Sequence, residues 1–252
     1  MAVKVLPGYD EQPERSRGHD VRVNPPDPDI ATIAAAIGQP ARASMLSALL
    51  SDAPLSVTEL ADRGSVSPAT ASLHLARLAA AGLVIGQRSG RTHRYRLAGV
   101  QAARALEALQ RLAQPAPTRS LATANAAQQI RFARSCYDHL AGKLGVAITD
   151  GLVQRGHLKT GPDAFSLTPS GEQWFASQQI DIAHLRTARR GFALRCLDWS
   201  ERQPHLAGAL GAALLTRSLD AGWVSRRHST RALTLTAAGA HTLHQQLGLE
   251  HP

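Results

Sequence analysis

The hydrophobic and polar positions of residues 30–112 fall into short blocks that predict helices with capping residues at their ends. Residues 30–37 are almost wholly apolar, Asp29 before them is a typical helix N-cap, and Gly38 after them stops a helix. A second helix is predicted to begin near Pro40. It carries four apolar side chains on one face, at Met45, Leu46, Leu49 and Leu50.

Two further helices follow, with clearer N-terminal signals. Ser56 stands three residues before Glu59, which is the spacing of a capping box. The next helix is predicted to have Ser67 as its N-cap and Pro68 as its first residue, and to end at Gly82. Its apolar side chains recur at helical spacing and predict a buried stripe of Ala71, Leu75 and Leu78.

The pattern then changes from helical to alternating. The stretch "LVIGQRSGRTHRYRLAG" predicts two strands around a tip at Ser89 and Gly90. No acidic residue lies between Gly82 and Leu97, and the hairpin carries Arg88, Arg91, Arg94 and Arg96. A further helix is predicted over about 100–112, and the proline-bearing "AQPAPTRS" after it is expected to be a linker.

This order of elements is that of a winged helix-turn-helix, whose second paired helix enters the DNA major groove. Small or hydroxyl side chains at the start of that helix can approach bases, while the hairpin arginines can reach phosphates or the minor groove. The candidate DNA-contacting residues are Ser67, Ala69, Thr70, Ser72, Leu73, His74 and Arg77 on the helix, and Arg88, Arg91 and His93 on the hairpin. The alternative is that Ser67 and Pro68 only cap a helix and the arginines only face solvent.

The distribution of charge favours the first interpretation. The chain has a formal net charge of +9, which suggests a polyanionic partner. Residues 30–113 contain nine arginines and four acidic residues, so over half of the net charge lies in a third of the chain. We therefore expect double-stranded DNA to be a partner.

The segment "ELADRGSVSPATASLHLARLAAAGLV" followed by "GRTHRYRL" resembles the ArsR-type family of bacterial winged-helix repressors. The resemblance covers about residues 30–113. It implies a homodimeric transcriptional regulator on a palindromic operator, with dimer contacts near 30–37 and 100–112. Many members sense metals through cysteines on the helix before the recognition helix, or through Asp and His on the last helix. Neither set is present in "VTELADRG" or in "VQAARALEALQRLA".

Residues 125–247 contain an internal repeat. "CYDHLAGKLG" begins at Cys136 and "CLDWSERQPHLAGALG" begins at Cys196, with six extra residues in the second copy. The stretch "FSLTPSG" at 165–171 parallels "LTLTAAG" at 233–239. Each unit is predicted as a helix, a second helical stretch, a short strand and a closing helix, so the half is expected to hold two helical or degenerate winged-helix units.

The repeated cysteines and histidines are candidates for metal or redox chemistry. Cys136 and His139 are three residues apart on a predicted helix, so both can face one ligand, and Cys196, Asp198 and His205 are the candidates in the second copy. Thiolate and imidazole suit zinc or another soft metal. The alternatives are thiol redox or electrophile sensing, and buried cysteines with histidines that support packing.

Large aromatic residues gather in the same half. The candidates for an apolar effector pocket are Trp174, Phe192, Trp199 and Trp223, with core packing as the alternative. The repeat also contains Gly142, Gly145, Gly208 and Gly211, which we expect to be positions where segments of the chain pack closely.

The chain is thus expected to be mainly α with small β-hairpin wings. We predict a disordered tail at 1–29, the winged helix-turn-helix at 30–113, a linker at 114–124 and a sensor domain at 125–247. No signal sequence or membrane-length apolar run is seen, so a cytoplasmic location is expected, and no catalytic motif is found. The function expected is a repressor released by a small-molecule or metal effector. The alternative is a constitutive or architectural DNA-binding protein.

Overall fold

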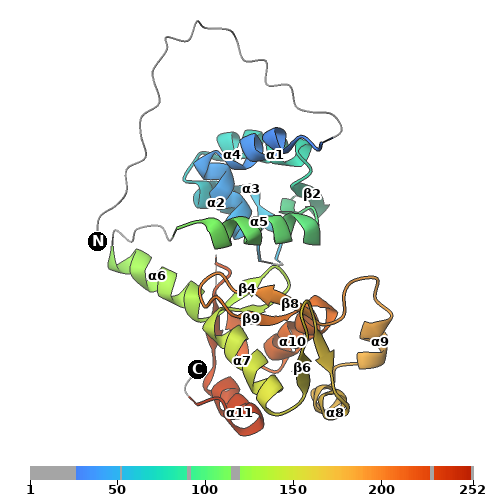
Figure 1. The fold of residues 1–252 in the computed structure, drawn as a ribbon. Helices are drawn as coiled ribbons and strands as arrows, with labels where there is room; N and C mark the ends of the chain where they lie inside the picture. Colours follow the sequence, from blue (N-terminus) through green and yellow to red (C-terminus); the bar gives the residue numbers. More distant parts are fainter. Residues whose placement is uncertain (1–26, 52, 90–91, 115–119, 228–229, 251–252) are drawn as a thin grey trace, which may run out of the picture.

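The computed structural model describes residues 27–51, 53–89, 92–114, 120–227 and 230–250. These residues pack around two separate hydrophobic cores. One is built from residues between 45 and 106, and the other from residues between 133 and 249. Helix α5 lies between the two halves, with the winged part on one side of it and the C-terminal part on the other (Figure 1). Most of the predicted N-terminal tail lies outside the described residues.

The first half has the predicted winged helix-turn-helix order. Its elements are α1 (Ile30–Ile37), α2 (Pro40–Ala48), β1 (Leu55–Ser56), α3 (Val57–Gly64), α4 (Pro68–Ala80), β2 (Val84–Ser89), β3 (Thr92–Leu97) and α5 (Val100–Leu112). The three strands form an antiparallel sheet in the order β1-β3-β2. The predicted hairpin is confirmed, and its tip lies outside the described residues.

The predicted capping residues are confirmed as the physical reason for these helix starts. Asp29 accepts a hydrogen bond from Thr32 N at 3.2 Å, and Ser67 accepts one from Thr70 N at 3.2 Å. At α3, Ser56 and Glu59 satisfy each other's backbone N–H groups in a full capping box. The α4 side chains at 71, 75 and 78 are fully buried, as the predicted stripe required.

The second half begins with α6 (Leu121–Phe132), whose first turn falls within the segment expected to be a linker. Two copies of one arrangement follow, each a hairpin, a helix, a second hairpin and a closing helix. The first copy is β4 (Arg134–Cys136), β5 (His139–Ala141), α7 (Gly142–Gln154), β6 (Leu158–Thr160), β7 (Phe165–Leu167) and α8 (Pro169–Ser177). Helix α9 (Ile182–Arg186) leads to the second copy, which is β8 (Leu194–Leu197), β9 (Pro204–Ala207), α10 (Gly208–Asp220), β10 (Val224–Arg226), β11 (Leu233–Leu235) and α11 (Ala237–Leu247).

The prediction of Cys136 and His139 on a helix is wrong. They pair across the antiparallel strands β4 and β5, and Cys196 pairs with His205 in the same way across β8 and β9. Tyr137 has a left-handed φ of 60° in the tight turn, which a continuous helix does not allow. Each unit therefore starts with a hairpin rather than a helix, and it contains two hairpins rather than one short strand.

The repeated glycines hold close approaches between backbone segments. Gly142 and Gly208 both have a φ of 80°, where the chain turns from the hairpin into the helix. A Cβ on Gly145 would lie 2.5 Å from Leu140 O, and the backbone of Leu206 crowds Gly211 in the same way. The interpretation of these glycines as close-packing positions agrees with this geometry.

The two copies exchange contacts. Helix α7 packs against β9 of the second copy, and α10 packs against β5 of the first. Thr149 on α7 carries one such link: its hydroxyl accepts a hydrogen bond from Leu206 N at 2.9 Å and donates one to Gly145 O. The two repeated hairpins are therefore held side by side.

Candidate functional site

The leading turns of α4 form the candidate DNA-reading surface. Ser67, Ala69, Ser72, Leu73 and Arg77 are exposed, as a recognition helix requires. Leu73 is 68% exposed, so packing within the described residues does not explain a leucine at this position. The hydroxyl of Ser72 donates to Pro68 O at 2.9 Å, and its oxygen still has a lone pair free.

Two predicted helix contacts are less available. Thr70 is half-buried, and its hydroxyl oxygen lies 2.9 Å from the hydroxyl oxygen of Ser67. His74 is also half-buried, with Nδ1 3.5 Å from an Arg42 guanidinium nitrogen. Burial, and then the charge of Arg42, lower the pKa of His74, which favours the neutral ring. On the wing, Arg88 and His93 are exposed and face each other across β2 and β3. Arg91 lies outside the described residues.

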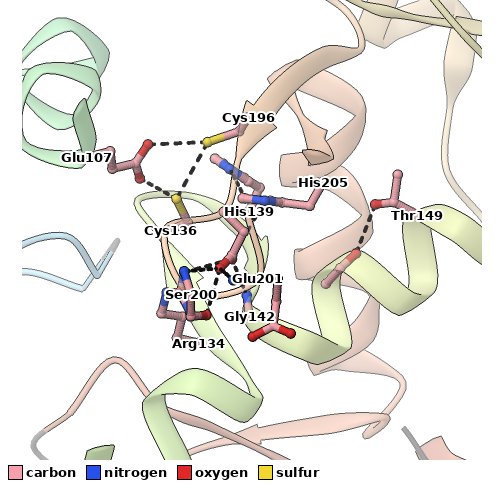
Figure 2. Close-up of polar contacts among 12 residues, drawn as sticks. Glu107, Arg134, Cys136, His139, Gly142, Thr149, Cys196, Ser200, Glu201 and His205 are labelled. Carbon is pink, nitrogen blue, oxygen red and sulfur yellow. Dashed lines mark hydrogen bonds and ion pairs between the residues drawn. The ribbon is translucent and has the colours of Figure 1, made fainter. Parts of the chain in front are cut away.

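A cluster of two cysteines and two histidines forms where the repeated hairpins meet (Figure 2). The ligand atoms of Cys136, His139, Cys196 and His205 all lie within 4.8 Å of one another. The two Sγ atoms are 3.9 Å apart, and the two Nε2 atoms are 3.1 Å apart. Cys196 is half-buried, and the other three side chains are buried. The structure thus brings together the two cysteines and two histidines among the predicted metal or redox candidates.

A carboxylate from the winged half completes the surroundings of the cluster. Glu107 on α5 is buried and accepts hydrogen bonds from both thiols: a very short one from Cys136, and one of 3.5 Å from Cys196 (Figure 2). Sequence reasoning missed Glu107 because it searched the last helix for histidine and aspartate. The available signal was an acidic residue beside Ala103 and Leu106 on the apolar face of that helix.

Burial and mutual charge shift the pKa values of this group. Burial, and then the charge of Cys196, raise the pKa of Glu107 to about 7. Burial raises the pKa of Cys136, whereas the hydrogen bond with Cys136 lowers that of Cys196. Burial lowers the pKa of His139, but the hydrogen bond with Asp138 and the contact with Cys196 outweigh it and raise the value to about 9. The same surroundings therefore shift the pKa values of the two thiols in opposite directions.

Asp198, a candidate in the second copy, is engaged elsewhere. Its Oδ2 accepts from Arg134 at 2.7 Å and from Gly142 N at 2.7 Å, and its Oδ1 accepts from the hydroxyl of Ser200. Both side chains of the pair with Arg134 are fully buried. Although burial would raise the pKa of Asp198, the charge of Arg134 holds it well below its usual range. Asp198 is thus a structural residue rather than a ligand.

The comparisons agree with the architecture of the first half. Residues 37–87 match the family described as a helix-turn-helix domain. The chain is 40% identical over 224 residues to the uncharacterized HTH-type transcriptional regulator YdfF of Bacillus subtilis (strain 168), which covers 89% of this chain and 99% of that protein. This chain belongs to the HTH-type transcriptional regulators.

Solved structures similar to this regulator cover about a third of its chain. Reduced HlyU from Vibrio cholerae N16961 is 31% identical, with 34% of this chain and 90% of that chain covered and a TM-score of 0.31. The homodimeric winged helix-turn-helix domain of Mb0332 from Mycobacterium bovis is 29% identical, with 33% and 76% covered and a TM-score of 0.31. Within the described residues of this regulator, no helix is long and apolar enough to cross a membrane.

The aromatic residues of the regulator do not form one pocket. Trp223 is buried in the second core, and Trp174 and Phe192 pack against that core. The ring of Trp199 lies 4.5 Å from the Arg134 guanidinium. Three of the four side chains therefore pack in or against the second core, whereas Trp199 lies over Arg134.

A different cavity lies between the halves of the regulator. It has a volume of about 420 Å³ and borders His139 and Cys196 as well as Glu107. Four arginines also line it, Arg104, Arg111, Arg190 and Arg195. The cluster is thus reachable from a cavity that four arginines also line.

Proposed function

We propose that this transcriptional regulator is a homodimeric repressor that an effector acting on its C-terminal half releases from the operator. The observation that carries the proposal is the contact of Glu107 with both cysteines. Glu107 belongs to α5 of the winged half, whereas the cysteines belong to the two repeated hairpins. A change at the thiols therefore acts directly on a helix of the DNA-binding half.

Exposed apolar residues support the homodimer. Ile30 on α1 and Leu112 on α5 are 78% and 80% exposed, and Leu109 and Leu121 are also exposed. They lie on the elements where the family resemblance predicts dimer contacts, or next to them. The opposite face of α5 carries Glu107, so this one helix would serve the dimer and the C-terminal half. A ligand bound to the C-terminal half would then change the spacing of the two recognition helices through α5 alone.

Further contacts join α5 and α2 to the C-terminal half. Arg231 donates to the Gln110 side chain at 3.1 Å, and Tyr137 N donates to Leu50 O at 2.7 Å. Tyr137 directly follows Cys136 in the hairpin turn, and its side chain packs against the winged core. A shift of the hairpin therefore reaches the helix-turn-helix by two routes.

Repression is tested with an operator selected from a random duplex library. The selected DNA is placed at a promoter that drives a reporter, and the chain is expressed in the same cells. We expect lower reporter activity, a palindromic selected sequence and two chains bound per site in sedimentation. Higher reporter activity would contradict a repressor, and one chain per site would contradict the dimer.

The effector-released mechanism is separated from the constitutive or architectural alternative by a perturbation that needs no known effector. Alkylation of the cluster thiols with N-ethylmaleimide should change operator affinity, since an added group cannot fit between Cys136, Cys196 and Glu107. The matched control is a protein with serine at both cysteine positions, treated in the same way. Equal affinity with and without alkylation would support the constitutive alternative.

A further inference from the structure

We propose that Cys136, His139, Cys196 and His205 form a tetrahedral site for a thiophilic divalent cation, best matched by zinc, and that Glu107 transmits its occupancy to the DNA-binding half. The transmission rests on the function proposed above, whereas the metal site stands on its own geometry. The site differs from the positions on the helix before the recognition helix and on the last helix, where the family resemblance predicts metal ligands.

The distances between the ligand atoms fit a tetrahedral ion. Zinc binds sulfur at about 2.3 Å and nitrogen at about 2.0–2.1 Å, so a tetrahedral site needs about 3.8 Å between sulfurs and about 3.3 Å between nitrogens. The observed Sγ–Sγ distance is 3.9 Å and the Nε2–Nε2 distance is 3.1 Å. Two thiolates and two imidazoles are also the donor set of many structural zinc sites.

Each repeated hairpin supplies half of the site. Cys136 lies opposite His139 in β4 and β5, and Cys196 lies opposite His205 in β8 and β9. Residues opposite each other in an antiparallel pair point to the same face, so each hairpin presents one sulfur and one ring together. The packing of α7 on β9 and of α10 on β5 turns these two faces toward each other.

The far side of each ring faces a carboxylate. Asp138 Oδ1 lies 3.3 Å from His139 Nδ1, and Asp198 Oδ2 lies 3.8 Å from His205 Nδ1. His205 Nδ1 is buried and has no hydrogen-bond partner within the described residues. The carboxylate of Asp138 holds the proton of the His139 ring on Nδ1 and leaves Nε2 as the metal-binding atom, which is the common arrangement of histidine ligands.

Charge and access also suit a cation. When the two thiols bind the ion, each loses a proton to solvent, so the two sulfurs balance a divalent charge. Cys196 and His139 border the cavity between the halves, which gives the ion a path from solvent.

A disulfide between the cysteines is the competing outcome, because their sulfurs are close. It would use only the two sulfurs and would leave the two buried imidazoles, 3.1 Å apart at Nε2, without a role in the site. The metal site uses all four side chains, and for this reason we favour it. The disulfide is separated from it by the tests below, which are carried out on reduced protein.

The ion must alter the contact between the halves. Cys136 and Cys196 both donate S–H hydrogen bonds to Glu107 in this structure. A metal-bound thiolate has no proton to donate, so the carboxylate must turn toward the ion or move away from the sulfurs. In either case the contact that joins α5 to the two hairpins changes, and we expect this change to lower operator affinity.

The metal site is tested by titrating reduced, metal-free protein with Co²⁺ under anaerobic conditions. We expect one equivalent to bind per chain, with thiolate-to-cobalt charge-transfer absorption and the intense visible bands of tetrahedral cobalt, and Zn²⁺ should displace both. Cys136→Ser and His205→Asn should weaken Co²⁺ binding by at least tenfold. His184→Ala, an exposed histidine outside the cluster, is the matched control and should bind as the wild type does.

A second measurement keeps the test valid if a variant fails to fold. One equivalent of Zn²⁺ added to the wild type should protect both thiols from a thiol-reactive dye, and EDTA should restore their reactivity. Absence of the charge-transfer band together with unprotected thiols overturns the metal site. Tetrahedral bands that persist in both cluster variants overturn the assignment of the ligands.

Transmission is tested by measuring operator affinity with and without Zn²⁺. We expect Zn²⁺ to weaken operator binding by about tenfold or more, within the range of ordinary allosteric coupling. Glu107→Gln should still bind Zn²⁺ but lose most of this response. Zinc that binds without changing operator affinity overturns the role of Glu107. If alkylation changes operator affinity while zinc does not bind, the metal site is wrong and the proposed function stands.

Discussion

Replacement of Leu73 by alanine gives a direct test of the DNA-reading surface. The side chain projects from α4 and is 68% exposed, while its neighbours Ala71 and Leu75 are fully buried. An exposed leucine adds nothing to the core, so its removal should change the free energy of unfolding by less than about 0.5 kcal/mol. In the major groove the same side chain can pack against a thymine methyl group.

The size of the effect follows from the exposed apolar surface. Leucine to alanine removes three carbon atoms, each worth about 0.8 kcal/mol when fully removed from water. Because about a third of the side chain is already covered, contact with DNA can gain about 1.6 kcal/mol, which is a factor of about 15 in Kd. A dimer on a palindromic operator uses the residue twice, so the whole complex should lose about 200-fold.

The assay is fluorescence anisotropy with the selected operator and with a scrambled duplex at one stated salt concentration, since affinity for DNA depends strongly on salt. Leu73→Ala should weaken operator binding and leave scrambled DNA almost unaffected. Leu197→Ala, which trims an exposed leucine in the C-terminal half, is the matched control and should leave both unaffected. A loss below threefold on the operator, or an equal loss on both duplexes, would refute the placement of Leu73 against a base.

Further predictions concern the wing, the recognition helix, the repeat and the dimer. Arg88→Ala on the wing should reduce the magnitude of the slope of log K against log salt by about 2, since a dimer uses the residue twice; salt titration of DNA binding measures this. Ser72→Ala should weaken operator binding more than binding to random DNA in the same anisotropy assay. Asp198→Asn should lower the free energy of unfolding by about 3–5 kcal/mol in urea, because it leaves Arg134 buried without its partner. Asp138→Asn, the matched change in the first copy, should cost less than about 1 kcal/mol because its partner Arg190 is 38% exposed. Leu112→Glu should shift sedimentation toward the monomer, and an unchanged dimer would place the interface elsewhere.

The winged half could be predicted from sequence because its signals are local. The starts of α1, α2, α3 and α4 are each marked by a side chain that bonds to a backbone N–H three residues later, as at Asp29, Ser56 and Ser67. The wing has six residues in each strand, enough for an alternating pattern to appear. Local rules and tertiary packing agree along this segment, so both the order of elements and the boundaries of α5 follow from the sequence.

The C-terminal half was harder to predict because its strands are too short to show an alternation of apolar and polar residues. Strands β4 and β5 have three residues each, and Cys136 with Leu140 imitates the spacing of one helical face. What fixes the hairpin is non-local: Tyr137 N donates to Leu50 O of the winged half, and Ser135 N donates to Arg231 O of the second copy. No window of the sequence around Cys136 contains those partners.

The candidate site shows the same division between local and non-local information. The repeat in the sequence identified four residues of the site, since one cysteine and one histidine recur in each copy. It did not show that the two copies face each other. Neither hairpin alone supplies more than two ligands, and structural zinc sites need four. The duplication therefore made a complete site possible only when the copies packed together, and the same packing placed the site against α5. Glu107 has no counterpart in the repeat because it belongs to the DNA-binding half. This one residue makes the cluster a point of contact between the halves rather than an isolated feature of the C-terminal fold.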